Sequence, residues 1–182
     1  MSWSRRRVLQ TGCGLGSLSA LGLRVGSARS EETASKRIAL FNLHTSERVD
    51  IEYARGGRYV PEALASIETV LRDFRTGERH AIDPALMDYL VEVAHAAGVD
   101  PSFKVISGYR SPQTNAHLRE RSTGVAEHSL HIEGRAIDVR VAGVDCATLA
   151  GHAIDLQRGG VGYYRASDFV HLDTGRFRTW KG

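Results

Sequence analysis

The sequence has little cysteine and no long hydrophobic run, and both absences limit what this chain can be. Only two of its 182 residues are cysteines, Cys13 and Cys146, so a framework of several disulfides is excluded. The uncharged stretch near the N-terminus, residues 11–23, is shorter than the roughly 20 apolar residues that a membrane-spanning helix needs. We therefore expect no stable membrane anchor.

The N-terminal 28 residues resemble an export signal. The segment Ser4-Arg5-Arg6-Arg7-Val8-Leu9 has the polar residue, arginine pair and apolar pair of a twin-arginine signal. Residues 11–23 suit its hydrophobic region, and Gly26-Ser27-Ala28 offers small residues for cleavage. We expect the twin-arginine machinery to deliver the chain to the periplasm and residues 1–28 to be removed. A cytosolic protein with a basic N-terminal arm is the alternative reading.

Removal of this segment changes the charge of the chain. The full sequence has a net charge of +3, and residues 1–28 hold four arginines and no acidic residue. The remaining chain has 20 basic and 21 acidic residues, a net charge of −1. The basic isoelectric point of about 9.1 therefore belongs to the targeting segment and does not indicate nucleic-acid binding. Cys146 alone remains, so no internal disulfide is expected.

The rest of the chain has the length of a single domain. We expect a polar lead-in at residues 29–36 and one domain at residues 37–182. Apolar periodicity and caps predict strands at 37–45, 48–55, 103–106, 136–141, 161–164 and 169–172, and helices at 61–74, 84–97, 112–121 and 146–156. Helices come early and short strands late. This order favours an α+β fold with helices packed on a small antiparallel sheet.

The predicted strand at residues 136–141 places a carboxylate opposite the core. Its apolar residues at 137, 139 and 141 share one face, so Asp138 points to the other face. In a continuous strand His131 would point away from Asp138, because their separation of seven residues is odd. A turn at residues 133–135 resets this alternation, and Gly134 permits the chain to fold back. The turn would let His131 and Asp138 converge.

A second strand adds two more polar side chains. In the segment 167–173, Val170 and Leu172 are predicted to face the core, so His171 and Asp173 face the opposite way. Two imidazoles and one carboxylate with an open fourth position are the ligands of many catalytic zinc sites. From spacing alone, histidines with purely structural roles remain an equal alternative.

Three ordered motifs resemble one family. The segment "SLHIEGRAID" (residues 129–138) resembles the S-x-H-x-x-G-x-A-x-D signature of the D-Ala-D-Ala metallopeptidases and their relatives, which include hedgehog-type domains. The segments "SGYRS" (107–111) and "SDFVHLDTG" (167–175) resemble the arginine segment and the closing segment of that family. The resemblance extends over most of the chain after about residue 37, and it is strongest to the exported murein endopeptidase K branch.

The resemblance implies a catalytic site, residue by residue. One zinc ion per chain would be held by His131, Asp138 and His171. Asp168, three residues before the last of these ligands, takes the place of the catalytic acid, although many relatives have Glu there. Arg110 matches the arginine that contacts substrate or developing negative charge.

Further residues near the ligands have supporting roles in this reading. His128 and Ser129 would bind substrate or support a ligand, and Asp173 would hold a histidine ring in orientation. The fold implied is that of the hedgehog and D-Ala-D-Ala peptidase group.

The function implied is a monomeric, zinc-dependent endopeptidase of the periplasm. Its substrate would be the stem peptides of peptidoglycan, and the direct diaminopimelate–diaminopimelate link is the crosslink that the branch suggests. Two alternatives stay open: a carboxypeptidase that removes terminal D-Ala, and a non-catalytic zinc-containing module that binds the cell wall.

Overall fold

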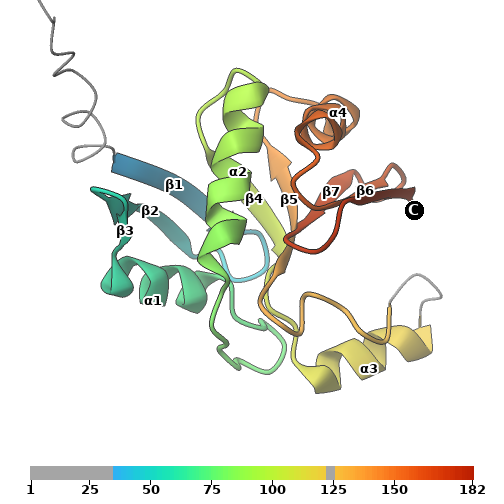
Figure 1. The fold of residues 1–182 in the computed structure, drawn as a ribbon. Coiled ribbons are helices and arrows are strands. Elements are labelled where there is room, and N and C mark those ends of the chain that lie inside the picture. The colour runs from blue at the N-terminus through green and yellow to red at the C-terminus, as the bar shows by residue number, and fades with distance from the viewer. Residues whose placement is uncertain (1–34, 122–125) are drawn as a thin grey trace, which may run out of the picture.

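The computed structural model describes residues 35–121 and 126–182, which form four helices and one eight-stranded sheet (Figure 1). The helices are α1 (Pro61–Val70), α2 (Pro84–Ala96), α3 (Pro112–Arg121) and α4 (Cys146–Leu156). The strands are β1 (Ser35–Asn42), β2 (Arg48–Arg55), β3 (Arg58–Tyr59), β4 (Ser102–Ser107), β5 (Ala136–Val141), β6 (Gly160–Tyr164), β7 (Phe169–Asp173) and β8 (Arg178–Lys181).

The fold class is α+β, as the order of elements predicted, but the sheet differs from the prediction in size and direction. Its strands run in the order β3-β2-β1-β4-β5-β7-β6-β8. Two neighbouring pairs, β1 with β4 and β6 with β8, are parallel, so the sheet is mixed and not wholly antiparallel. The strands β3 and β8 were not predicted, because each is too short and too polar to show alternation.

The N-terminal boundary of the domain also shifts slightly. Strand β1 begins at Ser35, two residues before the predicted start, so it takes in the end of the polar lead-in. The proposed export signal at residues 1–28 lies outside the described residues. Within the described part of the chain, no helix has the length and apolar character that crossing a bilayer requires.

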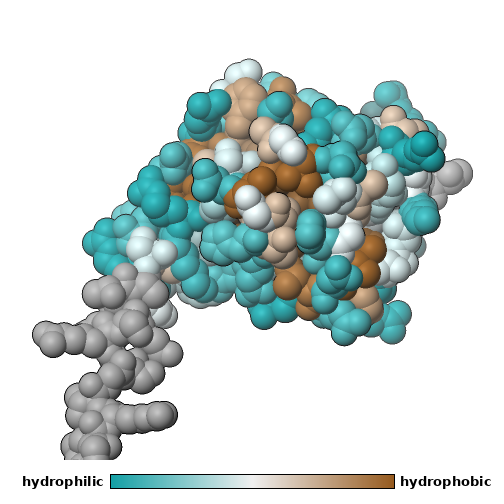
Figure 2. Space-filling view, turned by 90° about the horizontal axis from the view of Figure 1, so that it is seen from above, coloured by the Kyte–Doolittle hydropathy of each residue, from teal (hydrophilic) through white to brown (hydrophobic). Residues whose placement is uncertain are grey.

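The hydrophobic core lies between the sheet and the helices α1, α2 and α4, while α3 lies apart from these three (Figure 1). The predicted core-facing residues of β5 and β7 are buried: Ile137, Val139, Val170 and Leu172 have no exposed surface. Seen from above, the molecule is mostly hydrophilic with small hydrophobic areas (Figure 2). Because these buried residues occupy alternate positions in β5 and β7, the opposite face of the two strands is free for polar side chains.

Helix α1 ends earlier than predicted, and the buried carboxylate of Asp73 beyond its end holds the start of α3. The helix stops at Val70 and does not continue to Phe74. Beyond it, Asp73 Oδ2 accepts hydrogen bonds from the backbone N–H and the hydroxyl of Ser111, at 2.9 and 2.7 Å. Asp73 Oδ1 accepts a further one from the N–H of Arg75 at 2.9 Å. These contacts compete with the helical hydrogen bonds and anchor the segment next to Arg110.

Replacing Asp73 by asparagine is expected to lower the free energy of unfolding by about 1–3 kcal/mol at pH 7. Burial raises the pKa of Asp73, but hydrogen bonds from Thr114 and Ser111 outweigh burial and lower this pKa to about 2. Because the folded-state pKa lies below the ordinary 3.8, this stabilisation is present above about pH 4 and is lost as the pH falls toward 2.

Urea unfolding of wild type and Asp73→Asn at several pH values from 7 to 3 measures this contribution. The difference between the two proteins is expected to shrink as the pH falls below 4. A difference that stays constant over this range would contradict the proposed role of the ionised carboxylate.

Candidate active site

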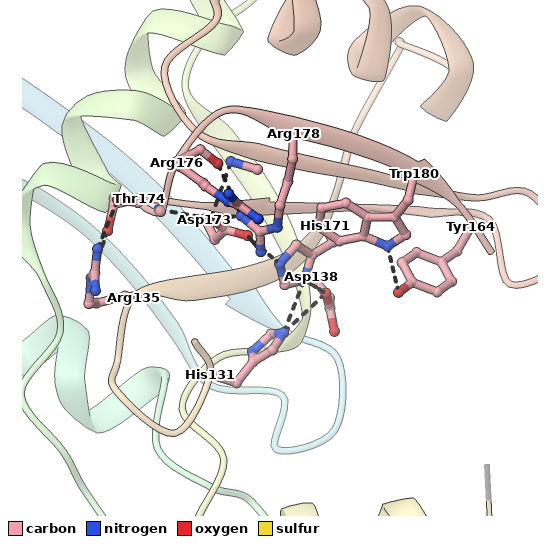
Figure 3. A network of polar contacts seen from close by, with 12 residues as sticks. His131, Arg135, Asp138, Tyr164, His171, Asp173, Thr174, Arg176, Arg178 and Trp180 are labelled. Atoms are coloured by element: carbon pink, nitrogen blue, oxygen red, sulfur yellow. Dashed lines mark hydrogen bonds and ion pairs between the residues drawn. The ribbon is translucent and has the colours of Figure 1, made fainter. Parts of the chain in front are cut away.

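Three buried side chains converge on the polar face of the sheet. His131 lies in the turn before β5, Asp138 lies in β5, and His171 lies opposite Asp138 in β7. His171 Nδ1 is 2.9 Å from Asp138 Oδ1, and His131 Nε2 is 3.3 Å from the same oxygen and 3.2 Å from His171 Nδ1. Figure 3 shows the three side chains pointing toward one another. Their exposed fractions are 2%, 7% and 8%, so little solvent reaches them.

The turn between His131 and Asp138 depends on glycine, as the sequence indicated. Gly134 has a φ of +66°, and a Cβ at this position would lie 2.1 Å from the carbonyl oxygen of Ala81. The Gly134 N–H donates to the carbonyl of His131 at 3.3 Å, and its own carbonyl accepts from Asp83 N–H at 3.0 Å. Any side chain at residue 134 would therefore displace the turn that carries His131.

The three side chains fit a zinc ion by ligand type and by spacing. Two imidazoles and one carboxylate are the donors of catalytic zinc sites, which leave a fourth position open. A tetrahedral ion about 2.0–2.1 Å from each ligand separates neighbouring ligand atoms by about 3.3 Å. The atoms lie 2.9 to 3.3 Å apart here. Within residues 35–121 and 126–182, no other group of three or more His, Cys, Asp or Glu side chains converges in this way.

The second nitrogen of each imidazole is held by the protein. His131 Nδ1 donates to the carbonyl of Gly108 at 2.7 Å, which leaves Nε2 free to bind a metal. His171 Nε2 lies 3.1 Å from Asp173 Oδ2, which leaves Nδ1 facing the other two ligands. Contacts of this kind fix the tautomer and the ring orientation of metal-binding histidines. The predicted orienting role of Asp173 thus has a geometric basis.

Charge is shared unequally among His131, Asp138 and His171. Burial lowers the pKa of His131. Burial would also lower the pKa of His171, but hydrogen bonds to Asp138 and Asp173 outweigh it and raise this pKa to about 9. The two imidazoles hold the pKa of Asp138 well below its usual range in spite of its burial. A metal ion that binds here at neutral pH would therefore displace a proton from the His171 ring.

The three side chains lie in a pocket of about 420 Å³. One wall is aromatic: Trp180 Nε1 donates to the hydroxyl of Tyr164 at 3.0 Å, and the Tyr164 ring stacks on Phe169. Trp180 comes from β8 and lies against Gly162 of β6, where a Cβ would be 2.5 Å from the indole ring. The remaining lining residues are Arg110, Ala126, His128, Ser129, Leu130, Ser167 and Arg178.

Arg110 reaches this pocket and keeps hydrogen-bonding capacity there. Its Nη2 is 3.7 Å from Asp138 Oδ2, and its Nη1 donates to Asn115 Oδ1 at 3.4 Å. Its Nε is buried and has no hydrogen-bond partner among the described residues. Burial lowers the pKa of Arg110, but a guanidinium remains charged. A buried cationic donor beside the ligands suits the binding of a carboxylate or a developing oxyanion.

The structure brings most of the predicted site residues together, with one exception. His128 and Ser129 line the pocket, as do Arg110 and the three residues predicted to bind zinc. Asp168 lies at the irregular start of β7 with a φ of +51°, but its carboxylate pairs with Arg140 at 3.6 Å and does not line the pocket. Its side chain is 70% exposed. In this conformation of the turn, the residue that the resemblance implied as the catalytic acid therefore lies outside the pocket.

No role was predicted for Arg178, which lines the same pocket as His131, Asp138 and His171. It follows the closing motif in a strand of four residues that alternation did not reveal. The only sequence signal is the spacing of Arg178 and Trp180, two residues apart, which places them on the same face of a strand.

Comparison with known proteins identifies the family. The family model described as peptidoglycan L,D-endopeptidase MepK matches residues 30–180. A probable peptidoglycan L,D-endopeptidase MepK from Haemophilus influenzae is 42% identical over 152 residues, which is 82% of each chain. The peptidoglycan L,D-endopeptidase MepK of Escherichia coli strain K12 is 41% identical over 143 residues, or 79% of each chain.

No solved structure matches the chain significantly. The match to the family model nevertheless covers all but the last two of the described residues, and it includes His131, Asp138, His171, Arg110 and most of β8. Both relatives match over about four fifths of their own length, so the similarity is not confined to a single motif. The chain therefore belongs to the peptidoglycan L,D-endopeptidase MepK family, and by that membership it is a peptidase.

Proposed function

We propose that this protein is a zinc-dependent endopeptidase that hydrolyses crosslinks between the stem peptides of peptidoglycan. The observation that carries the proposal is the buried set of His131, Asp138 and His171 at the base of the pocket. Family membership supports the reaction class, and the names of the relatives describe L,D-endopeptidases of peptidoglycan.

Each part of the pocket has a role in this reaction. When bound, zinc lowers the pKa of a water ligand to about 7 and polarises the scissile carbonyl. Arg110 would donate hydrogen bonds to the negative charge that develops on the carbonyl oxygen, or to a substrate carboxylate. Tyr164 and Trp180 would pack against the aliphatic side chains of a stem peptide. His128 and Ser129 line the same pocket and would also contact the peptide.

For the proton acceptor we propose Asp168. It lies three residues before His171, and its neighbours Ser167 and Phe169 both line the pocket. Apart from Asp138, no carboxylate among the described residues lines this pocket. A change of the turn at residues 165–168 would exchange the contact between Asp168 and Arg140 for a position facing the substrate.

Digestion of defined muropeptides by the mature protein tests this function. The bond that we propose is the direct diaminopimelate–diaminopimelate link, so a dimer joined in this way should yield two monomers by mass spectrometry. Loss of a single D-Ala from a pentapeptide would instead indicate a carboxypeptidase. Binding of muropeptides without any change in mass would indicate a non-catalytic wall-binding module.

The site of action that we propose is the periplasm, where peptidoglycan is found. Changing both Arg5 and Arg6 to lysine is expected to leave the precursor in the cytoplasm, because a paired arginine is the feature that the twin-arginine machinery reads. Fractionation and immunoblotting of the precursor and mature forms measure this. Normal processing of the doubly substituted chain would point to a different export route.

A further inference from the structure

Behind the metal centre, the carboxylate of Asp173 has no exposed surface and accepts five hydrogen bonds. Arg178 binds both oxygens, with Nη2 at 2.7 Å from Oδ2 and Nη1 at 3.0 Å from Oδ1. The backbone N–H groups of Gly175 and Gly160 donate to Oδ1 at 2.8 and 3.2 Å. Oδ2 faces His171 Nε2 at 3.1 Å (Figure 3).

This arrangement offsets the cost of burying the charge of Asp173. Burial raises the pKa of Asp173, but hydrogen bonds with His171 and Arg178 outweigh burial and hold this pKa well below its usual range. A planar guanidinium that binds both oxygens also fixes the rotation of the carboxylate, which a single donor cannot do. The direction in which Asp173 presents Oδ2 to the His171 ring is therefore set by Arg178.

The ion pair between Asp173 and Arg178 occupies space that is open because residues 160 and 175 are glycines. A Cβ at Gly160 would lie 2.3 Å from Asp173 Oδ2 and 2.5 Å from Arg178 Nη1. A Cβ at Gly175 would lie 2.8 Å from Asp173 Oδ1. Neither glycine has a positive φ, so close approach of this ion pair, and not backbone conformation, requires the absence of a side chain.

We propose that Arg178 is a positioning residue that orients the zinc ligand His171 through Asp173. The chain of contacts runs from Arg178 to both oxygens of Asp173, from Asp173 Oδ2 to His171 Nε2, and across the ring to Nδ1 at the metal centre. Arg178 also lies over the Trp180 ring at 4.9 Å, so the same side chain contacts the pocket wall. This inference rests on the proposed zinc site.

Arg178→Met retains most of the side-chain stem and removes both donors. Its zinc dissociation constant, measured by competition with a chromogenic chelator, is expected to rise by at least about tenfold, the lower end of what loss of such a supporting contact costs. Arg178→Lys should recover part of the affinity, because an ammonium restores the charge but cannot bind both oxygens in the same plane. Gly160→Ala should weaken zinc binding too, although it removes no donor.

Arg135→Met is the matched control. Arg135 and Arg178 have the same side-chain exposure, 39%, and both bind the chain at the end of β7. Arg135 donates to the carbonyl of Thr174 at 2.9 Å and does not contact Asp173. This variant should lower the melting temperature of the metal-free protein by an amount similar to Arg178→Met, yet leave zinc affinity within about twofold of wild type.

The outcomes separate this inference from the proposed function. Zinc affinity unchanged in Arg178→Met, or weakened equally in Arg135→Met, would overturn the positioning role while the wild type still binds zinc. Failure of the wild-type protein to bind zinc would overturn the proposed function and the positioning role together. The positioning role is supported if zinc affinity falls in Arg178→Met and Gly160→Ala but not in Arg135→Met, and is partly recovered in Arg178→Lys.

Discussion

The His131→Ala protein is expected to lose its zinc and its ability to cleave crosslinked muropeptides. The substitution removes one of the three proposed ligands, and the remaining two, Asp138 and His171, cannot complete a site of the catalytic type. Loss of a contact that only supports a metal ligand lowers metal affinity by roughly 10- to 100-fold. The loss of zinc affinity in His131→Ala should be larger than this. Metal analysis after dialysis, together with turnover by mass spectrometry, measures both effects.

His95→Ala is a suitable control for this experiment. His95 is an exposed histidine in the last turn of α2, and it has no contact with the three ligands. The control should retain one zinc ion per chain and wild-type turnover. Wild-type zinc content in His131→Ala would show that the metal is held elsewhere.

The second large effect is expected from Asp168→Asn, which keeps the size of the side chain and removes its charge. If Asp168 accepts the proton of the attacking water, turnover should fall by at least about a hundredfold while zinc content stays unchanged. Arg140→Met removes the partner that holds the carboxylate outside the pocket, so it should leave turnover at or above the wild-type value.

His128→Gln is the necessary comparison, because His128 lines the pocket and can also carry a proton. Near-normal turnover in Asp168→Asn combined with a large loss in His128→Gln would move the acceptor role to His128. Loss of zinc from Asp168→Asn would instead mean that this residue supports the metal.

Local pattern was sufficient to predict which face of the sheet carries the proposed zinc ligands. In β5 and β7, buried residues at alternate positions fix which face is polar, and Asp138 and His171 follow from that alternation alone. Gly134 indicated the turn that brings His131 to the same face. Spacing alone left the role of these residues open, and the resemblance to the family signature was needed to predict that they bind one metal ion.

The features that were not predicted depend on contacts between segments that are far apart in the sequence. The parallel pairing of β1 with β4 and of β6 with β8 has no signal in local sequence. Arg178 reaches Asp173 only because β8 lies beside β6 at the edge of the sheet. Asp168 was predicted from the resemblance to the family's closing segment, but this residue has a left-handed conformation and its carboxylate pairs with Arg140.

A crystal structure of the zinc-loaded mature protein, with anomalous diffraction at the zinc edge, tests the central claim most directly. The expected result is one strong anomalous peak per chain, about 2.0–2.2 Å from His131 Nε2, an oxygen of Asp138 and His171 Nδ1, with a fourth position open to solvent. A zinc-loaded protein whose only anomalous peaks lie outside the pocket would contradict the assignment of these three residues as the metal centre.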